Sequence, residues 1–143
     1  MIAKLERIGI QTTRDTELID ITPTVLAAVA RAGVRDGRVF VNTLHTTTAI
    51  TVNEGLQDLE DDLLALLADL VPPDRPYRHA RFLHSDGQMA VNAPSHLRGA
   101  LLGMHVSFPI ANGEIVRGSR QTIYFVELDG PLFREYTVQV VGE

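Results

Sequence analysis

Polar and apolar residues alternate near both ends of the chain, and this pattern predicts a β-rich protein. A loose alternation over residues 3–13 predicts a first strand. β-Branched residues dominate 37–43 and 49–53, which favours two further strands. Beyond residue 103 every segment has a strand pattern, and Asn112-Gly113 is the signature of a two-residue hairpin turn. We expect these later strands over residues 104–110, 114–118, 121–128 and 132–141, with a turn at Asp129-Gly130-Pro131.

Between these strands the apolar residues recur at three- and four-residue steps, which predicts helices. Thr22-Pro23 supplies an N-cap and a first-turn proline for a helix over 23–32, which Gly33 ends in the left-handed conformation. A stripe of leucines predicts the longest helix over 56–71. Two prolines follow it, and proline cannot continue a helix.

A third helix is expected to be short, from Pro94-Ser95 to Gly103. It follows the least regular part of the chain, in which Asp86-Gly87 predicts a turn. Strands at both ends with two to three helices between them predict an α+β fold in a single domain, residues 1–143.

Composition narrows the class of protein. The chain has 143 residues, of which 45% are hydrophobic and 22% charged, as in an ordinary globular domain. Its net charge of −5 offers no general attraction for phosphate backbones, so we expect no nucleic-acid partner. The absence of cysteine excludes disulfides, thiolate metal ligands and a cysteine nucleophile. With no secretion signal and no apolar run of roughly 20 residues, we expect a cytoplasmic protein without a membrane partner.

The histidines are the most informative candidates for chemistry. No two have the i, i+4 spacing of a helical zinc site. Three fall at element ends or in irregular segments, where functional residues concentrate: His45 at a strand end, His79 in the proline-rich segment and His96 at the start of the short helix. Imidazoles brought together from distant segments suit zinc. The alternative is that some of the five histidines, which also include His84 and His105, are ordinary surface or core residues.

Other polar residues are candidates for binding an anionic ligand. Thr47 lies in a row of three threonines whose alternate hydroxyls can donate to an anion, although threonine also simply favours a strand. Arg120 and Gln121 lie between two predicted strands, where a guanidinium and an amide suit phosphate or carboxylate; a polar hairpin end is the alternative. Asn53-Glu54 precedes the long helix as a turn or as a polar pair in a pocket.

The acidic residues at the start of the long helix have both a structural and a functional interpretation. Glu60, Asp61 and Asp62 favour the positive end of the helix dipole, but one of them is also a candidate acid, base or partner of a histidine.

Several segments of the chain together match the motifs of one known family. His45-Thr46-Thr47 with residues 49–54 resembles the family's HTTAALTINE, and Tyr77 with His79 resembles its YxH. Pro94-Ser95-His96-Leu97 resembles its short helix. Residues 113–125 resemble GxLxLGTWQGIYF, which precedes a glutamate and an Asp-Gly-Pro turn. The chain thus resembles the YjbQ-like family, whose members are often labelled secondary thiamine-phosphate synthase enzymes, and the resemblance covers nearly the whole chain in order.

This resemblance implies a β-sheet sandwich, commonly a homotrimer, around a pocket lined by the family's histidines. Carried over by position, these are His45, His79 and His96. From the chemistry of imidazole we expect them to bind a divalent metal, zinc more than magnesium, or otherwise to bind an anion directly. The resemblance also implies Thr47, Asn53, Glu54 and Gln121 as nearby polar groups, and Asp62 matches the family's helix aspartate. From the chemistry of these side chains we expect Thr47, Asn53, Arg120 and Gln121 to bind substrate, and Glu54 and Asp62 to move a proton or orient a histidine.

The chain also departs from the family pattern. Arg120 stands where the family has tryptophan, Thr122 follows the glutamine in place of glycine, and Gly55 and Gln88 replace asparagines.

Three hypotheses follow from these residues. The first is an enzyme acting on a small phosphorylated or otherwise anionic metabolite, with thiamine-phosphate synthase (transferase) activity or metal-dependent hydrolysis as the reaction. The second is a non-catalytic trimeric module that binds such a metabolite. The third gives the histidines a structural role at subunit contacts.

Overall fold

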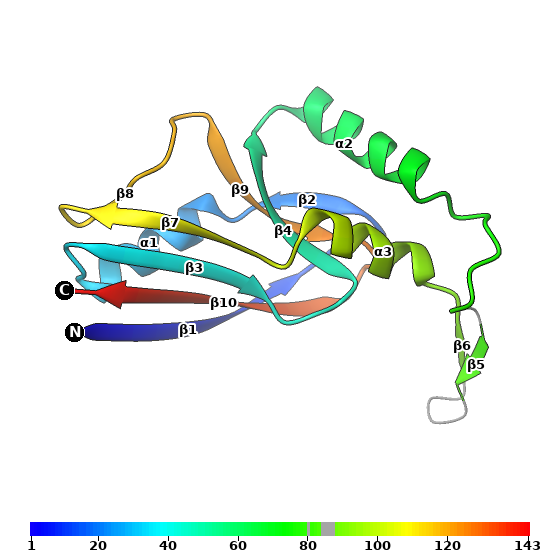
Figure 1. Cartoon of the computed structure of the whole chain (residues 1–143), viewed down its shortest axis with the longest axis horizontal. Helices are drawn as coiled ribbons and strands as arrows, with labels where there is room; N and C mark the ends of the chain where they lie inside the picture. Colours follow the sequence, from blue (N-terminus) through cyan, green and yellow to red (C-terminus); the bar gives the residue numbers. More distant parts are fainter. Residues whose placement is uncertain (80, 84–87) are drawn as a thin grey trace.

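Over the residues that the structure describes, the fold is built from two antiparallel sheets, a small hairpin and three helices (Figure 1). The computed structural model describes residues 1–79, 81–83 and 88–143. His84 and the Asp86-Gly87 turn therefore lie outside the described residues. The strands are β1 (Ile2–Gln11), β2 (Glu17–Asp20), β3 (Gly37–Thr43), β4 (Thr48–Glu54), β5 (Arg81–Leu83), β6 (Gln88–Ala90), β7 (His105–Ala111), β8 (Glu114–Ile115), β9 (Gln121–Glu127) and β10 (Phe133–Gly142). The helices are α1 (Thr22–Ala32), α2 (Gln57–Leu70) and α3 (Ala93–Leu102).

The larger sheet has the strand order β1-β10-β3-β7-β8, and the smaller one has β2-β9-β4. Every pairing within them is antiparallel, and both chain ends lie at the same end of the larger sheet (Figure 1). The α+β class with two antiparallel sheets is therefore confirmed, with three helices.

The two faces of β9 show how the layers pack. Ile123 and Phe125 point into the main core between the sheets, which α1 completes with Val25 and Val29. Their neighbours Tyr124 and Val126 point the other way, into a second cluster with Leu67 and Leu102 of α2 and α3. Because strand side chains alternate between faces, one strand serves both clusters. The smaller sheet thus lies between the larger sheet and helices α2 and α3.

Most predicted elements are confirmed, with two instructive errors. The N-cap prediction for Thr22 is wrong: α1 includes this residue, and its hydroxyl instead accepts a hydrogen bond from the Ile123 N–H at 2.8 Å. His45 does not end a strand, because β3 stops at Thr43 and residues 44–47 form a loop. The Asn112-Gly113 turn is confirmed, since both residues have positive φ, 54° and 84°.

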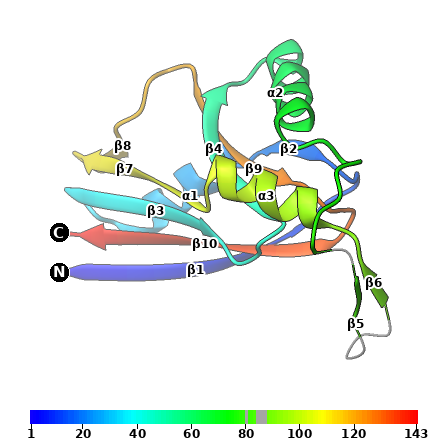
Figure 2. The ribbon, with the colours of Figure 1, turned by 45° about the vertical axis from the view of Figure 1, so that its right-hand side comes forward.

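Helix α2 is attached less tightly than α1 and α3. Leu67 is its one buried residue, and in the turned view the helix stands away from the two sheets, whereas α3 crosses β4 (Figure 2). Leucines on both outer helices are exposed: Leu66 and Leu70 on α2, Leu97 and Leu101 on α3. Within the described part of the chain, no helix has the length and apolar content to span a bilayer.

Candidate functional site

Two of the three predicted histidines meet beside the start of α3. The rings of His79 and His96 contact edge to face, with centroids 5.1 Å apart and planes at 86°. They line a cavity of about 360 Å³ together with Tyr77, Arg78, Ala93 and Leu97. Tyr77 fixes the loop before His79, because its hydroxyl donates to the Pro72 carbonyl at 2.6 Å. The cavity therefore combines an apolar wall, two imidazoles and a guanidinium.

An asparagine connects this histidine pair to the end of β9. The Asn92 side chain lies 3.1 Å from His79 Nε2 through its Oδ1, and its Nδ2 donates to Asp129 Oδ2 at 2.8 Å. One turn into α3, the Ser95 hydroxyl donates to the Leu128 carbonyl at 2.6 Å. The first turn of α3 and residues 128–129 thus hold each other in place.

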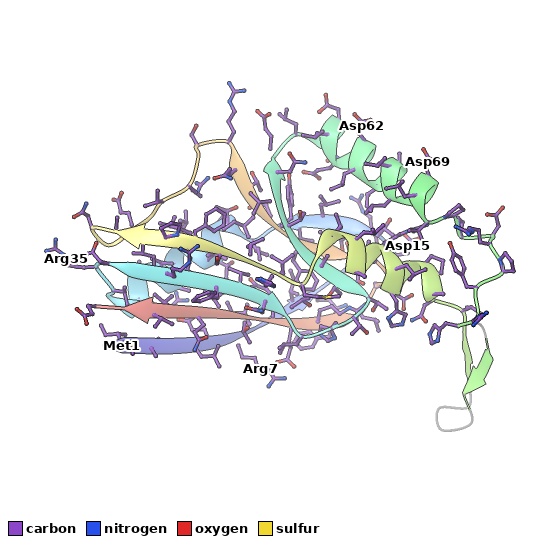
Figure 3. The ribbon with its side chains drawn as sticks, in the orientation of Figure 1. Met1, Arg7, Asp15, Arg35, Asp62 and Asp69 are labelled. Atoms are coloured by element: carbon purple, nitrogen blue, oxygen red, sulfur yellow. The ribbon has the colours of Figure 1, made fainter. Side chains whose placement is uncertain are left out.

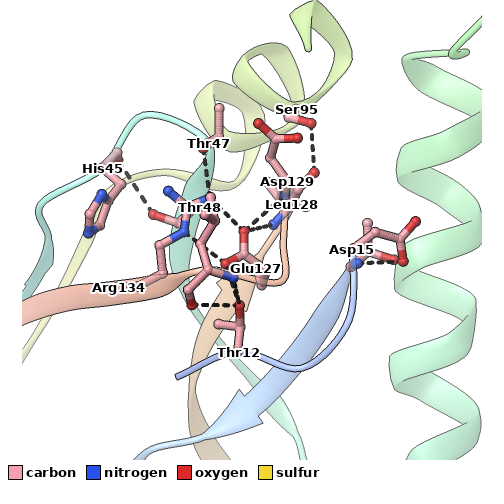
Figure 4. Close-up of polar contacts among 12 residues, drawn as sticks. Thr12, Asp15, His45, Thr47, Thr48, Ser95, Glu127, Leu128, Asp129 and Arg134 are labelled. Carbon is pink, nitrogen blue, oxygen red and sulfur yellow. Dashed lines mark hydrogen bonds and ion pairs between the residues drawn. The ribbon is translucent and has the colours of Figure 1, made fainter. Parts of the chain in front are cut away.

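Glu127, two residues before Asp129, forms a buried ion pair with Arg134. Glu127 is fully buried and Arg134 is 5% exposed, and they make two hydrogen bonds of 2.7 and 2.8 Å (Figure 4). Glu127 also accepts from the Thr12 hydroxyl at 2.9 Å and from the backbone N–H of Leu128 and Asp129. Burial alone raises the pKa of Glu127, but these donors outweigh it and hold the pKa below its ordinary value. The carboxylate is thus ionised and fully satisfied.

Thr47 belongs to this buried network rather than to an open wall. Its hydroxyl accepts a hydrogen bond from Arg134 Nη2 at 2.9 Å, and its carbonyl accepts from the Leu128 N–H. The residue is 7% exposed. Its hydroxyl therefore helps to fix Arg134, and the predicted substrate-binding role has no support from this contact.

His45 lies on the other side of Arg134, in the loop between β3 and β4 (Figure 4). Its Nε2 accepts the backbone N–H of Glu135 at 2.9 Å. Burial first, and then the charge of Arg134, lower the pKa of His45, which favours the neutral ring. In a neutral ring whose Nε2 accepts, Nδ1 carries the proton. His45 thus has no lone pair left for a metal, and the predicted metal role conflicts with this bond.

The cavity does not provide a complete metal site within one chain. Zinc in proteins takes three or four protein ligands. Across the residues that the structure describes, no group of three histidine, cysteine, aspartate or glutamate side chains converges. His79 and His96 supply two imidazoles, but the predicted third, His45, is committed elsewhere. A bound zinc does not fit this set of donors from a single chain.

Four other predicted residues lie together, but at the far end of β4 from Thr48. Glu54 pairs with Gln121 in the sheet register, and its carboxylate lies 3.3 Å from Arg120 in an exposed ion pair. The seven residues of β4 span roughly 20 Å at the rise of a strand. Asn53, next to Glu54, is exposed. Within one chain this group does not close the histidine cavity.

Asp62 is separate from both groups. It is exposed on α2 and points away from the sheets (Figure 3). The glutamate two residues earlier, Glu60, is the one that faces inward, because it accepts the Tyr124 hydroxyl at 2.8 Å. The acidic start of α2 therefore contributes one structural contact and a solvated surface.

The sequence analysis did not name Arg134 or Glu127, although the alternation of their strands marks both as inward-facing. Arg134 shares the inward phase of Tyr136 and Val138 on β10, and Glu127 follows Ile123 and Phe125 on β9. Opposite charges in two apolar phases predict a buried ion pair. Asn92 and Asp129 carried no comparable signal, because both resemble ordinary cap and turn residues.

Comparison with known proteins agrees with this fold throughout. The family model described as "UPF0047 protein YjbQ-like" matches residues 6–143. The chain belongs to the YjbQ-like family. A UPF0047 protein of Methanothermobacter thermautotrophicus is 38% identical over 138 residues, which cover 96% of this chain and 92% of that protein. YugU of Bacillus subtilis, another UPF0047 protein, is 31% identical over 96% of this chain and 99% of its own length.

Solved structures of the YjbQ-like family have the same architecture. A protein of Sulfolobus solfataricus, described as YbjQ-like and of unknown function, is 34% identical with a TM-score of 0.89, over 99% of this chain and 98% of its own. A Clostridium acetobutylicum member of the yjbq/upf0047 family is also 34% identical, with a TM-score of 0.84, over 95% and 99%. The family and its fold are therefore established for this chain, whereas these relatives supply no reaction.

Proposed function

We propose that the cavity at the start of α3 binds a small phosphorylated or otherwise anionic metabolite, and that the protein is an enzyme acting on it. The observation that carries this proposal is the contact between His79 and His96 on a cavity wall that also includes Arg78. Imidazoles near neutrality both donate to anions and move protons. Arg78 is exposed and suits a phosphate or carboxylate group. The volume of about 360 Å³ suits a small metabolite.

A thermal-shift screen tests the binding half of the proposal. Inorganic phosphate, diphosphate and a panel of phosphorylated metabolites are added to the wild-type protein and to His79→Ala, His96→Ala and His105→Ala. His105 is an exposed histidine at the start of β7 and serves as the matched control. A ligand at 100 times its dissociation constant stabilises the fold by about 2.7 kcal/mol. We expect this stabilisation in the wild type and His105→Ala only. A ligand that stabilises all four proteins equally contradicts the site.

Mass spectrometry of each hit then separates an enzyme from a binding module. Consumption of the ligand, lost in His79→Ala, supports catalysis. Stable binding without turnover supports the non-catalytic alternative.

The first reaction to assay is the one implied by the family label. In it the thiazole nitrogen attacks the methylene of hydroxymethylpyrimidine diphosphate, and diphosphate leaves. Diphosphate chemistry of this kind usually uses Mg²⁺ held by carboxylates and phosphates. Two imidazoles are poor ligands for Mg²⁺. Formation of thiamine phosphate at a rate that His79→Ala abolishes would nevertheless assign it.

Zinc remains a proposal that metal analysis can test. The protein is purified without a histidine tag, and its bound metal is measured in the wild type, His79→Ala, His96→Ala, His45→Ala and His105→Ala. Stoichiometric zinc that survives in His45→Ala, but not in the first two variants, supports a site completed from outside the chain. Stoichiometric zinc that survives in all variants contradicts a histidine site.

We also propose that the protein assembles as a homotrimer. Exposed Leu97 and Leu101 on α3, beside His96, support a contact surface there, because apolar patches of this kind favour association. Light scattering coupled to gel filtration measures the mass directly, and a monomer at micromolar concentration contradicts the proposal. Leu101→Glu is expected to dissociate the assembly, whereas Leu5→Glu, on the edge strand β1, is its comparison.

A further inference from the structure

Asn92 does not act as an asparagine at a helix N-terminus usually does. It is the N-cap residue of α3, yet its side chain makes no capping hydrogen bond. A side-chain cap is typically worth about 1 kcal/mol. Its backbone carbonyl still accepts from the N–H groups of Ser95 and His96 at 3.0 and 3.3 Å, but its amide lies between His79 and Asp129. Such a departure from a local rule is expected where a residue has another task.

The two hydrogen bonds of this amide have one consistent direction. Asp129 presents a carboxylate oxygen, which accepts only, so the nitrogen of the Asn92 amide must face it. The amide oxygen then faces His79 Nε2. Because that oxygen also accepts only, Nε2 must be the nitrogen that carries the proton. In the neutral ring the lone pair is therefore on Nδ1.

Asp129 is itself held from both sides. Its backbone N–H donates to Glu127 Oε1 at 2.9 Å, and the preceding carbonyl, that of Leu128, accepts the Ser95 hydroxyl. The direction of the Asn92 amide is thus anchored to the buried ion pair through the backbone that follows β9. Movement of the loop that carries His79 does not by itself reverse it.

We propose that Asp129 and Asn92 are positioning residues that hold neutral His79 in the Nε2–H form, so that Nδ1 is its working nitrogen. The consequence for ligands rests on the proposed function: Nδ1 accepts a proton from a hydroxyl or a phosphate O–H of the bound metabolite. The Asn92 amide oxygen orients the His79 ring and does not itself react. Carboxylates and carbonyls orient metal-bound or catalytic imidazoles in the same way.

Nitrogen NMR of histidine-labelled protein tests this directly and needs no ligand. Two-bond ¹⁵N–¹H correlations, recorded above the ordinary imidazole pKa of about 6.5, separate the protonated nitrogen from the one with the lone pair. We expect wild-type His79 in the Nε2–H form alone. In Asp129→Asn the new amide can donate to Asn92 Oδ1, which lets the Asn92 amide turn over. That variant is expected to gain an Nδ1–H population.

Two further variants keep the test decisive. Asn92→Ala removes the acceptor, so the His79 Nε2 proton is expected to exchange faster with water. Asp69→Asn loses the same charge at an exposed position on α2. It is expected to change neither the Nδ1–H population of His79 nor the exchange rate of its Nε2 proton. An Nδ1–H form in the wild type overturns the proposal. So does a His79 spectrum unchanged in both Asp129→Asn and Asn92→Ala.

Titration with inorganic phosphate distinguishes failure of the proposed function from failure of this inference. Perturbation of His79 by phosphate in the wild type, weakened in Asn92→Ala, supports both. A silent titration with the expected tautomers removes the anion site but leaves the positioning role standing.

Discussion

Replacing Glu127 with glutamine is the sharpest test of how the site is held. The carboxylate accepts five hydrogen bonds, two from Arg134, two from backbone N–H groups and one from Thr12. Glutamine keeps one acceptor oxygen but places an NH₂ group against donors. Arg134, which is 5% exposed, then keeps its charge without an opposite charge beside it. Breaking a buried pair in this way costs about 3–5 kcal/mol of unfolding free energy.

The exposed pair between Arg7 and Glu135 provides the matched control. Its N–O distance is 2.8 Å, close to the buried pair, but the two side chains are 65% and 37% exposed. Surface pairs are worth between zero and about 1 kcal/mol. Urea denaturation at about pH 7 should therefore show a large loss for Glu127→Gln and a small one for Glu135→Gln. Equal losses in the two variants would refute the reasoning from burial.

The pH dependence gives this prediction a second, independent readout. The pKa of Glu127 is lowered in the folded state, so its contribution to stability is complete above the unfolded value of about 4.3. That contribution disappears as the pH falls through the lower, folded pKa. The difference between wild type and Glu127→Gln should therefore shrink in acid. A difference that stays constant down to about pH 3 contradicts an ionised Glu127.

Three further predictions concern the same region. Because the folded pKa of His45 is lowered, the wild type should lose stability as the pH falls below about 6.5, and His45→Gln should remove this dependence from the melting curve. Gly99→Ala should destabilise by about 1–3 kcal/mol, against the usual helix preference for alanine, since its Cβ meets the Thr48 carbonyl oxygen at 2.9 Å; an unchanged or raised melting temperature refutes this close approach. Ser95→Ala should cost about 1–3 kcal/mol in urea denaturation by leaving the Leu128 carbonyl unsatisfied, and a loss under about 0.5 kcal/mol would mean that water replaces the hydroxyl.

The periodic elements were predictable because their signal is local. The alternation of β10 and the leucine stripe of α2 each follow from burying one face, and the apolar run of β9 follows from burying both. The structure places all three within a few residues of the prediction. Short strands without such a stripe were missed, among them β2, which has four residues. The strand predicted directly after the Asn112-Gly113 turn, over 114–118, is also shorter than expected and ends at Ile115.

The site was less predictable, because it depends on which ends of the strands meet. His45 was expected at the end of a strand, because threonine favours strands, but the hydroxyls of Thr43 and Thr48 instead fix a loop around it. Pairing of Glu54 with Gln121 carries that group away from the histidines, and nothing in the local pattern gives the register. The contact between His79 and His96 depends on the path of the loop that carries His79, which the spacing of apolar residues does not predict.

The short corner formed by Glu127, Leu128 and Asp129 joins two parts of the protein that are usually separable. One side chain closes the interior, and the next but one reaches the histidine cavity through Asn92. A local opening of this corner would release Asn92 and His79 from their fixed orientation, while the strands of both sheets stayed paired. Conversely, a ligand that tightens the grip on His79 should slow amide exchange as far inside as Asp129, whose N–H bonds to Glu127. Ligand binding in the cavity would thus change the amide exchange rate of a residue beside the core, without any movement of the domain as a whole.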